Sequence, residues 1–237
     1  MNNRSATALP GLAHEFSHHG LDFRMVKAFG PTILETRLPD AVFKKMLELT
    51  DVLLADADRT SYGHNLVGQI REEPEIPIEM LREYDVYSFI HGLFAEYVLG
   101  CSFCDANPEY KATVSDFHKR SDYANPVHVD VEAAWLVSQY AGEFNPIHNH
   151  SQSTLSSVMY LKVPEQMEKE SIPGKAEVAG NIEWVYRSAD LMQNSTMRVK
   201  PEAGMFYIFP ASLLHLVYPF TSSEERRSVS INATHRL

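Results

Sequence analysis

Asn145-Pro-Ile-His148-Asn-His150-Ser-Gln-Ser-Thr-Leu-Ser-Ser-Val-Met-Tyr160 places two histidines one residue apart, directly before an apolar run that is typical of a β-strand. In an extended segment successive side chains alternate between faces, so His148 and His150 project to the same side. Two imidazoles on one side can bind one cation. A third ligand is needed, and His215, in the strand-like stretch Phe209–Pro219, is the best candidate. The sequence therefore predicts a metal site at a sheet edge.

Composition narrows the classes of function. The chain has 237 residues, of which 44% are hydrophobic and 22% charged, enough for the core of one domain spanning residues 1–237. Its formal charge is −10 and no Lys/Arg run is present, so nucleic acid is not an expected partner. The N-terminus lacks the apolar core of a signal peptide and no apolar run could cross a bilayer, so we expect a cytoplasmic protein with no membrane partner. A homo-oligomer is compatible with this sequence, which leaves the oligomeric state open.

The first half of the chain predicts strands followed by helices. Residues 21–38 have a strand-like pattern, and Pro39-Asp40 begins an amphipathic helix that runs to about Ala57. Residues 59–75 resemble a loop. A second helix is expected from about Ile78 to Leu99, with Gly100 ending it. Residues 21–105 would thus supply the first strands and a helical cover.

The second half, from about residue 107 to 235, predicts a β-sheet core. Short segments of β-branched and aromatic residues are divided by Gly, Pro, Asn and Ser, at this spacing typical of an antiparallel sandwich or barrel. The expected strands are Lys111–Asp116, Ala133–Tyr140, Leu155–Val163, Ile182–Tyr186, Thr196–Lys200, Met205–Phe209, His215–Tyr218 and Ser228–Ala233. The helices would pack on one sheet face. Because most of the expected elements are strands, we expect a mainly β fold.

The last predicted strand separates two faces clearly. Its period of two places Arg227 with Val229 and Ile231, and places a polar set on the opposite face. The polar set is Arg226, Ser228, Ser230 and Asn232. An arginine at the mouth of a polar-lined sheet is suited to bind a carboxylate, because its planar fork pairs two oxygens at once. The alternative is a surface arginine pair at a strand end.

With these motifs the chain resembles the iron(II)- and 2-oxoglutarate-dependent dioxygenases, especially oxygenases of marine bacteria and their phages, and has the motif order of prolyl hydroxylases. The specific part of the resemblance covers Ala134–Val163 and Ala203–Asn232. The resemblance implies a double-stranded β-helix, or jelly roll, with the N-terminal helices packed on one sheet. It also implies iron(II), 2-oxoglutarate and O₂ as cofactor and co-substrates.

Individual residues take roles from this resemblance. His148 matches the first iron ligand and His215 the last, whereas His150 stands where most members have Asp or Glu. Tyr160 and Arg226 match the residues that hold the far carboxylate of 2-oxoglutarate. Two further co-substrate contacts are expected, from Tyr140 in its Tyr-x-Gly motif and from Ser228 in the Arg-x-Ser motif. His128-Val-Asp130 is a weaker candidate for the ligand pair, because Asn125-Pro126 before it resembles a loop.

The implied activity is hydroxylation of a small-molecule or peptidyl substrate, with release of succinate and carbon dioxide; peptidyl proline is one candidate. A cupin-like protein with a three-histidine site is the main alternative, either as a 2-oxoglutarate-independent dioxygenase or as a small-ligand binder. A structural sandwich with incidental histidines is the third. Arg226 discriminates, since the dioxygenase interpretation requires it to face the metal. For Cys101 and Cys104 we expect ordinary thiols, because a lone C-x-x-C lacks further zinc ligands.

Overall fold

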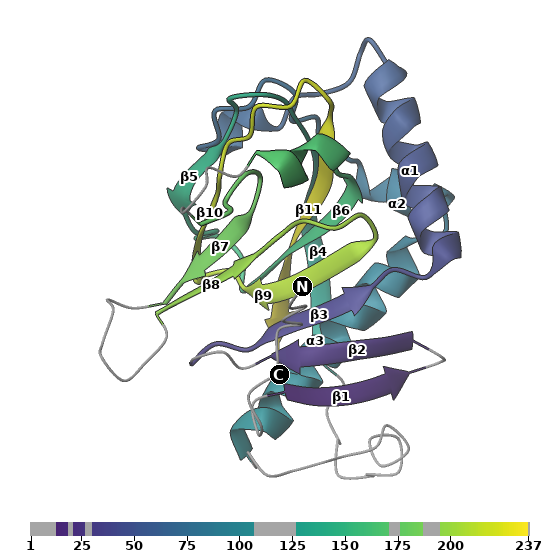
Figure 1. Ribbon diagram of the computed structural model, residues 1–237. Helices are drawn as coiled ribbons and strands as arrows, with labels where there is room; N and C mark the ends of the chain where they lie inside the picture. The colour runs from purple at the N-terminus through teal and green to yellow at the C-terminus, as the bar shows by residue number, and fades with distance from the viewer. Residues whose placement is uncertain are drawn as a thin grey trace.

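A computed structural model describes residues 13–18, 21–26, 30–106, 127–170, 176–186 and 195–236, and Figure 1 shows two β-sheets with helices beside them. The predicted strand Lys111–Asp116 lies outside the described residues. The fold is mainly β and is the expected double-stranded β-helix, because two antiparallel sheets face each other around a common interior.

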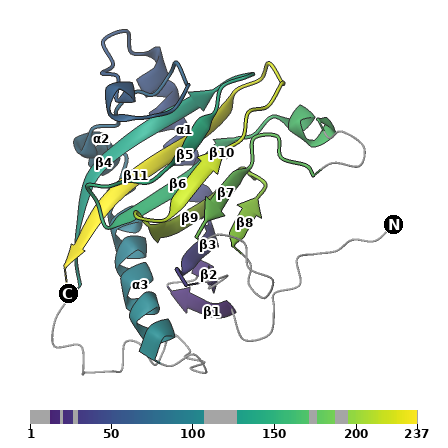
Figure 2. The ribbon, with the colours of Figure 1, turned by 90° about the vertical axis from the view of Figure 1, so that its left-hand side faces the viewer.

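The larger sheet has seven strands in the order β1-β2-β3-β9-β6-β11-β4. Their bounds in that order are Ala13–His18, Leu21–Val26, Ile33–Arg37, Met205–Pro210, Leu155–Lys162, Arg226–Arg236 and His128–Gln139. The smaller sheet has the order β5-β10-β7-β8, with bounds Asn145–His148, Leu214–Val217, Ile182–Val185 and Thr196–Val199. Figure 2 shows this smaller sheet lying over the larger one. Of these strands, β1 and β5 were not predicted.

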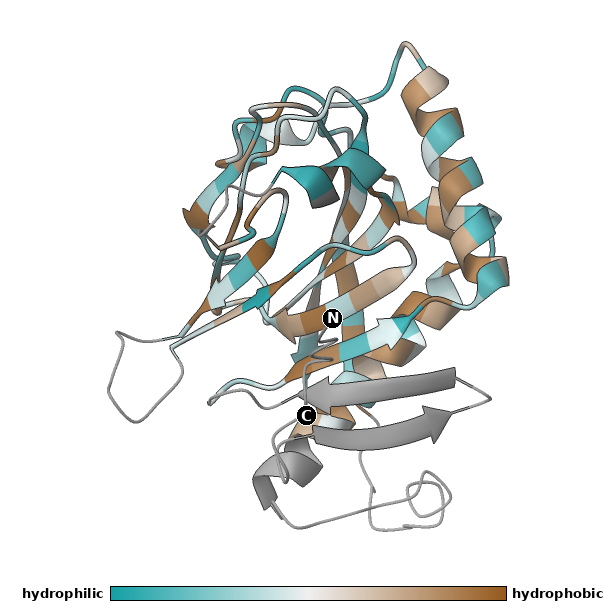
Figure 3. Cartoon of the chain, viewed as in Figure 1, coloured by the Kyte–Doolittle hydropathy of each residue, from teal (hydrophilic) through white to brown (hydrophobic). Residues whose placement is uncertain are grey.

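Three α-helices pack on the outer face of the larger sheet: α1 (Asp40–Ala55), α2 (Ile78–Glu83) and α3 (Tyr87–Ala106). Hydrophobic and hydrophilic residues alternate along α1, as its amphipathic sequence predicts (Figure 3). Two short 3₁₀ turns, Gly63–Asn65 and Glu165–Lys169, complete the helical elements described. Within the described part of the chain, no helix is both long and apolar enough to span a membrane.

The prediction of one helix from Ile78 to Leu99 is wrong, because Asp85 interrupts it. Asp85 has a φ of 53°. Its N–H donates to the Arg82 carbonyl at 2.9 Å, and the Val86 N–H donates to the Leu81 carbonyl at 3.0 Å. This pair of bonds ends α2 in the way that a left-handed residue, usually glycine, ends helices. Gly100, expected to be a stop, lies inside α3, which continues to Ala106.

Alternation along the central strands creates two cores. On β11, Val229 and Ile231 join the core beneath the helices, which also takes Met159 of β6 and Phe206 of β9. The alternate residues of β6 and β9 face the second sheet and form a smaller core around Trp184. The polar residues of β11 point to this same interior, so the space between the sheets is apolar at one end and polar at the other.

Candidate metal centre

Three histidines converge at the open edge of the smaller sheet. His148, the last residue of β5, is paired directly across from His215 on β10. One ring nitrogen of each of His148, His150 and His215 lies within 4.8 Å of the others. The ring centroids of His148 and His215 are 4.2 Å apart. The structure thus brings together the three residues that the spacing selected.

The local path of the chain differs from the expectation. His150 does not sit on a strand: β5 ends at His148, and the apolar run after the histidines forms β6 in the other sheet. The turn between them is held by the His150 N–H, which donates to the Ala211 carbonyl at 2.9 Å. His148 and His150 therefore face one point because the turn between β5 and β6 is held in place by this hydrogen bond. They do not lie on one strand.

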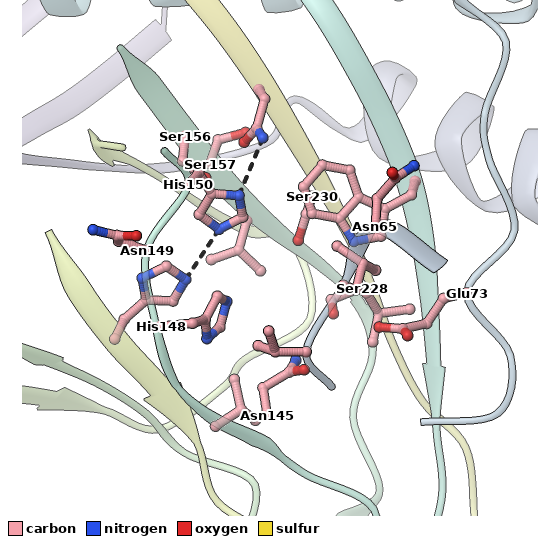
Figure 4. Close-up of a pocket in the computed structure, with 18 of the residues that line it drawn as sticks. Asn65, Glu73, Asn145, His148, Asn149, His150, Ser156, Ser157, Ser228 and Ser230 are labelled. Atoms are coloured by element: carbon pink, nitrogen blue, oxygen red, sulfur yellow. Dashed lines mark hydrogen bonds between the residues drawn. The ribbon is translucent and has the colours of Figure 1, made fainter. Parts of the chain in front are cut away.

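Hydrogen bonds orient each imidazole. His148 Nδ1 lies 2.7 Å from the Pro146 carbonyl, and His215 Nδ1 lies 3.0 Å from the Leu213 carbonyl. A carbonyl accepts only, so each Nδ1 carries the hydrogen and each Nε2 keeps a lone pair for a metal. His150 Nε2 is 3.3 Å from His215 Nε2, and its Nδ1 is 3.1 Å from Asn232 Nδ2 (Figure 4).

Burial favours the neutral form of all three imidazoles. Burial lowers the pKa of His148, with the bond to Pro146 opposing it. Burial and then the neighbouring His148 lower the pKa of His150 to about 4. Burial and both other histidines lower the pKa of His215 well below its usual range. Neutral imidazole is the form that ligates metals, so the cluster fits a divalent transition metal.

The histidines line a cavity of about 400 Å³ between the sheets, and the polar face of β11 lines it as well. Arg226 is buried there, with 1% of its surface exposed. Its Nη1 donates to Gln139 Oε1 at 2.9 Å, whereas its Nε and Nη2 have no hydrogen-bond partner among the described residues. Two buried and unpaired guanidinium donors on a residue that lines the cavity are suited to receive a carboxylate.

Tyr160 lies beside this arginine. The Arg226 Cζ is 4.9 Å from the centre of the Tyr160 ring, and in the described structure the buried phenol oxygen is without a hydrogen-bond partner. Burial raises the pKa of Tyr160, with Arg226 opposing it, and burial lowers the pKa of Arg226. The phenol is therefore a hydroxyl that can donate to the same anion as Arg226.

Comparison with known proteins agrees with this geometry. Residues 133–232 match the family described as "Putative 2OG-Fe(II) oxygenase". This part of the chain is therefore similar to the 2OG-Fe(II) oxygenases. The match includes all three histidines, Tyr160 and Arg226. No curated protein matches the chain in sequence.

Two solved structures share the fold of this chain. One is a prolyl hydroxylase from Trichoplax adhaerens in complex with a hypoxia inducible factor oxygen degradation domain peptide fragment; it is 12% identical, with a TM-score of 0.50, over 85% of this chain and 83% of that one. The other is the non-heme alpha ketoglutarate dependent epimerase SnoN from nogalamycin biosynthesis, 14% identical, with a TM-score of 0.50, over 84% and 77%. At these identities they establish the fold alone.

Arg227 lies on the opposite face of β11, as the period of two predicts. Its guanidinium contacts the Asp51 carboxylate at 2.6 Å and the Thr50 hydroxyl at 3.0 Å, both on α1. It also pairs with the Glu225 carboxylate at 2.7 Å. Arg226 thus faces the cavity between the sheets, while Arg227 contacts helix α1 on the outer face.

Of the other residues that the sequence singled out, one lines the cavity and the rest lie outside its lining. Ser228 lines the cavity next to Arg226. Tyr140 does not reach it: the side chain is 41% exposed and lies outside the cavity lining, because the strand ends before it and the chain turns at Gly142. His128 and Asp130 lie exposed on β4, where Asp130 pairs with Arg236, so they replace no ligand.

Sequence reasoning missed Glu73. It lies in the segment interpreted as loop, yet it lines the cavity and is only 4% exposed. Isolated bridges from Glu72 to Ser138 and from Glu75 to Trp135 lay this segment along β4. Burial, and then the nearby Glu143, raise the pKa of Glu73 to about 7. A charged residue in an aperiodic segment has no sequence signal for burial, so only the structure identifies it.

Proposed function

We propose that this chain is an iron(II)- and 2-oxoglutarate-dependent dioxygenase of the hydroxylase type. His148, His150 and His215 would bind iron(II), and Arg226 with Tyr160 would bind the far carboxylate of 2-oxoglutarate. The observation that carries the proposal is the buried Arg226, which has two unpaired donors in the cavity that the histidines line. An uncompensated buried guanidinium is costly, so its natural complement is an anionic ligand.

The donor set fits the cofactor pair. His148, His150 and His215 would hold a divalent metal through three neutral imidazole nitrogens, a donor type that suits iron(II). When bound, iron(II) with 2-oxoglutarate would supply oxidative decarboxylation to succinate and carbon dioxide, coupled to hydroxylation of a substrate C–H bond. The lack of a carboxylate ligand leaves the site one negative charge short of the usual set.

The residues of this chain supply position and shielding. Gln139 fixes Arg226 by accepting from Nη1, so that the remaining donors stay aimed into the cavity. The aromatic and aliphatic core around Trp184, Tyr207 and Phe209 closes one end of the interior against water. Exclusion of water strengthens each charged contact, and a preorganised site holds the reactants in the correct relative position.

Anaerobic titration tests the proposal. Addition of iron(II) and then 2-oxoglutarate to the purified protein is expected to produce the weak visible charge-transfer band of the chelate, and aerobic turnover is expected to produce succinate. Omission of iron(II) is the control. Absence of the band at saturating concentrations of both ligands would remove the proposal.

The three-histidine set also supports a second candidate, a cupin-like metal protein. Such a protein would bind metal through the same residues but would act without 2-oxoglutarate, as a direct dioxygenase or a small-ligand binder. Metal binding that is unaffected by 2-oxoglutarate, in the wild type and in Arg226→Ala alike, would favour this candidate.

The substrate of either candidate would be a small molecule or a peptidyl group. The structural neighbour solved with a peptide supports the peptidyl group.

A further inference from the structure

Glu73 is held in the cavity wall by backbone bonds. The Ser138 N–H donates to the Glu72 carbonyl at 3.0 Å, and the Leu136 N–H donates to the Pro74 carbonyl at 2.9 Å. The segment is therefore an added edge of β4 and holds a defined position. Figure 4 shows the Glu73 carboxyl group directed toward the interior, across from His148 and His150.

The Glu73 carboxylate differs in its contacts from the other buried carboxylate of this region, Glu143. Across the described ranges of the chain, no side chain or backbone N–H donates to it and no cation pairs with it, although the residue is only 4% exposed. Glu143, which is buried nearby, differs: Arg71 Nε contacts it at 3.1 Å and the Tyr140 N–H at 2.8 Å. The contrast singles out Glu73 as the uncompensated negative charge of the cavity wall.

A second oxygen acceptor faces the same space. The Asn145 amide oxygen and one Glu73 carboxylate oxygen both lie beside Gly68, since a Cβ there would lie 3.3 Å from Glu73 Oε1 and would collide with Asn145 Oδ1. Both residues line the cavity. Two oxygens that converge on one space, one of them charged, form an acceptor site for a group rich in N–H donors.

Glu73 is not part of the metal centre. The ligand atoms that lie within 4.8 Å of one another belong to the three histidines alone. Arg226, with Tyr160 beside it, is the group suited to the co-substrate. The Glu73 side of the cavity is thus left for the molecule that is oxidised.

We propose that Glu73, with Asn145, binds a positively charged nitrogen group of the prime substrate, an ammonium or guanidinium carried on an extended chain such as a lysine or arginine side chain. This substrate class rests on the proposed function for its chemistry, but binding of the cation does not require turnover. A cation supplies the counter-charge that the protein itself withholds, and its N–H groups satisfy both oxygens.

The ionisation of Glu73 agrees with this role. Burial raises its pKa to about 7, so the carboxyl group is poised between neutral and charged forms in the absence of a partner. A bound ammonium or guanidinium would favour the charged form. Cation binding is therefore expected to strengthen as the pH rises above 7.

Calorimetry on the protein loaded anaerobically with iron(II) and 2-oxoglutarate tests the inference. The probes are the N-acetyl amides of lysine and arginine, compared with those of 2-aminoheptanoic acid and citrulline, which match them in length and shape but lack the charge. The cationic probes are expected to bind about tenfold or more tightly than the neutral ones, and Glu73→Gln is expected to abolish that preference. Glu75→Gln, an exposed carboxylate two residues away, is the matched control and should retain the preference.

Equal binding of neutral and cationic probes, no binding of either cation, or an unchanged preference in Glu73→Gln would overturn the inference. The chelate band separates this outcome from failure of the proposed function. A normal band without cation preference rejects the cation site alone. Glu73-dependent cation binding without any chelate band keeps the site and rejects the 2-oxoglutarate-dependent activity.

Discussion

Asn232 determines whether His150 can ligate a metal. With Asn232 Nδ2 beside His150 Nδ1 at 3.1 Å, the amide donates, and the Asn232 oxygen is left buried without a partner in the described structure. Half a turn of the amide exchanges its oxygen and nitrogen at little steric cost. The oxygen then accepts from Nδ1–H, and His150 Nε2 is freed. All three imidazoles would then donate to an oxygen, as ligating histidines usually do.

Replacement of Asn232 tests this arrangement. Asn232→Leu, similar in size, is expected to weaken cobalt(II) or iron(II) binding by roughly 10- to 100-fold, because the tautomer of His150 is no longer imposed. Asn232→Asp keeps an acceptor and should retain tight binding. The cobalt(II) ligand-field spectrum and direct metal titration supply the measurement, with Ser230→Ala on the same strand face as control. Wild-type affinity in the leucine variant would show that Asn232 does not orient the ligand.

Arg226 and Arg227 are neighbours in sequence with opposite environments. Arg226→Ala is expected to raise the 2-oxoglutarate concentration needed for half-saturation by roughly 100-fold, because two charge-assisted bonds to the carboxylate are lost. Arg227→Ala should change it by less than about threefold, since Arg227 contacts helix α1 and Glu225. Titration of the chelate band measures both. Equal effects would defeat the assignment of the two strand faces.

Arg227 links helix α1 to β11 through polar contacts. One guanidinium joins Asp51 and Thr50 of α1 to Glu225, and the Arg227 side chain is 4% exposed. Arg227→Ala would leave the half-buried Glu225 without this partner, so we expect the free energy of unfolding in urea to fall by about 3 kcal/mol. Arg226→Ala removes a guanidinium with two unpaired donors and should cost less. A larger loss for Arg226→Ala would contradict this ranking.

Helices and strands with a strong hydrophobic period could be predicted from the sequence. Helix ends and short strands that depend on a few specific contacts could not. The alternation of β11 predicted which arginine faces the cavity, and the stripe of residues 40–57 predicted α1, because burial of one face imposes the period. The break at Asp85 was not predictable, since an aspartate in the left-handed conformation carries no distinctive signal. Strand β5 was missed because its four residues pair with β10 far along the chain.

The site as a whole combines chain segments with very different predictability. His148, His215, Tyr160 and Arg226 could be selected from sequence because their chemistry and strand context are visible there. Tyr140 follows the end of β4 and is exposed, so its expected contact with the co-substrate stays a prediction. Glu73 could not be selected at all. Its burial depends on a segment that adds to the edge of β4 through long-range backbone bonds.

Glu73 makes the stability of the whole protein depend on pH. Its pKa is about 7 in the folded state against 4.5 as the ordinary value, because burial and then Glu143 disfavour the charge. Between these values the folded state holds a proton that the unfolded state releases. Rising pH therefore favours unfolding, and this contribution to stability, fully present below pH 4.5, is lost as the pH passes 7.

Glu73→Gln removes that dependence, because the amide is neutral at every pH. Relative to wild type, the variant is expected to gain little free energy of unfolding near pH 4.5 and up to about 3 kcal/mol near pH 8, from 1.36 kcal/mol per unit of pKa difference. Urea denaturation of both proteins across this range gives the difference curve, in which titrations common to both cancel. Glu75→Gln, exposed in the same segment, should give a flat curve. The contrary result is a difference in the free energy of unfolding between Glu73→Gln and wild type that stays constant from pH 4.5 to 8. It would mean that the protein compensates the charge of Glu73. The cation site depends on that charge being uncompensated, so this result would count against it as well.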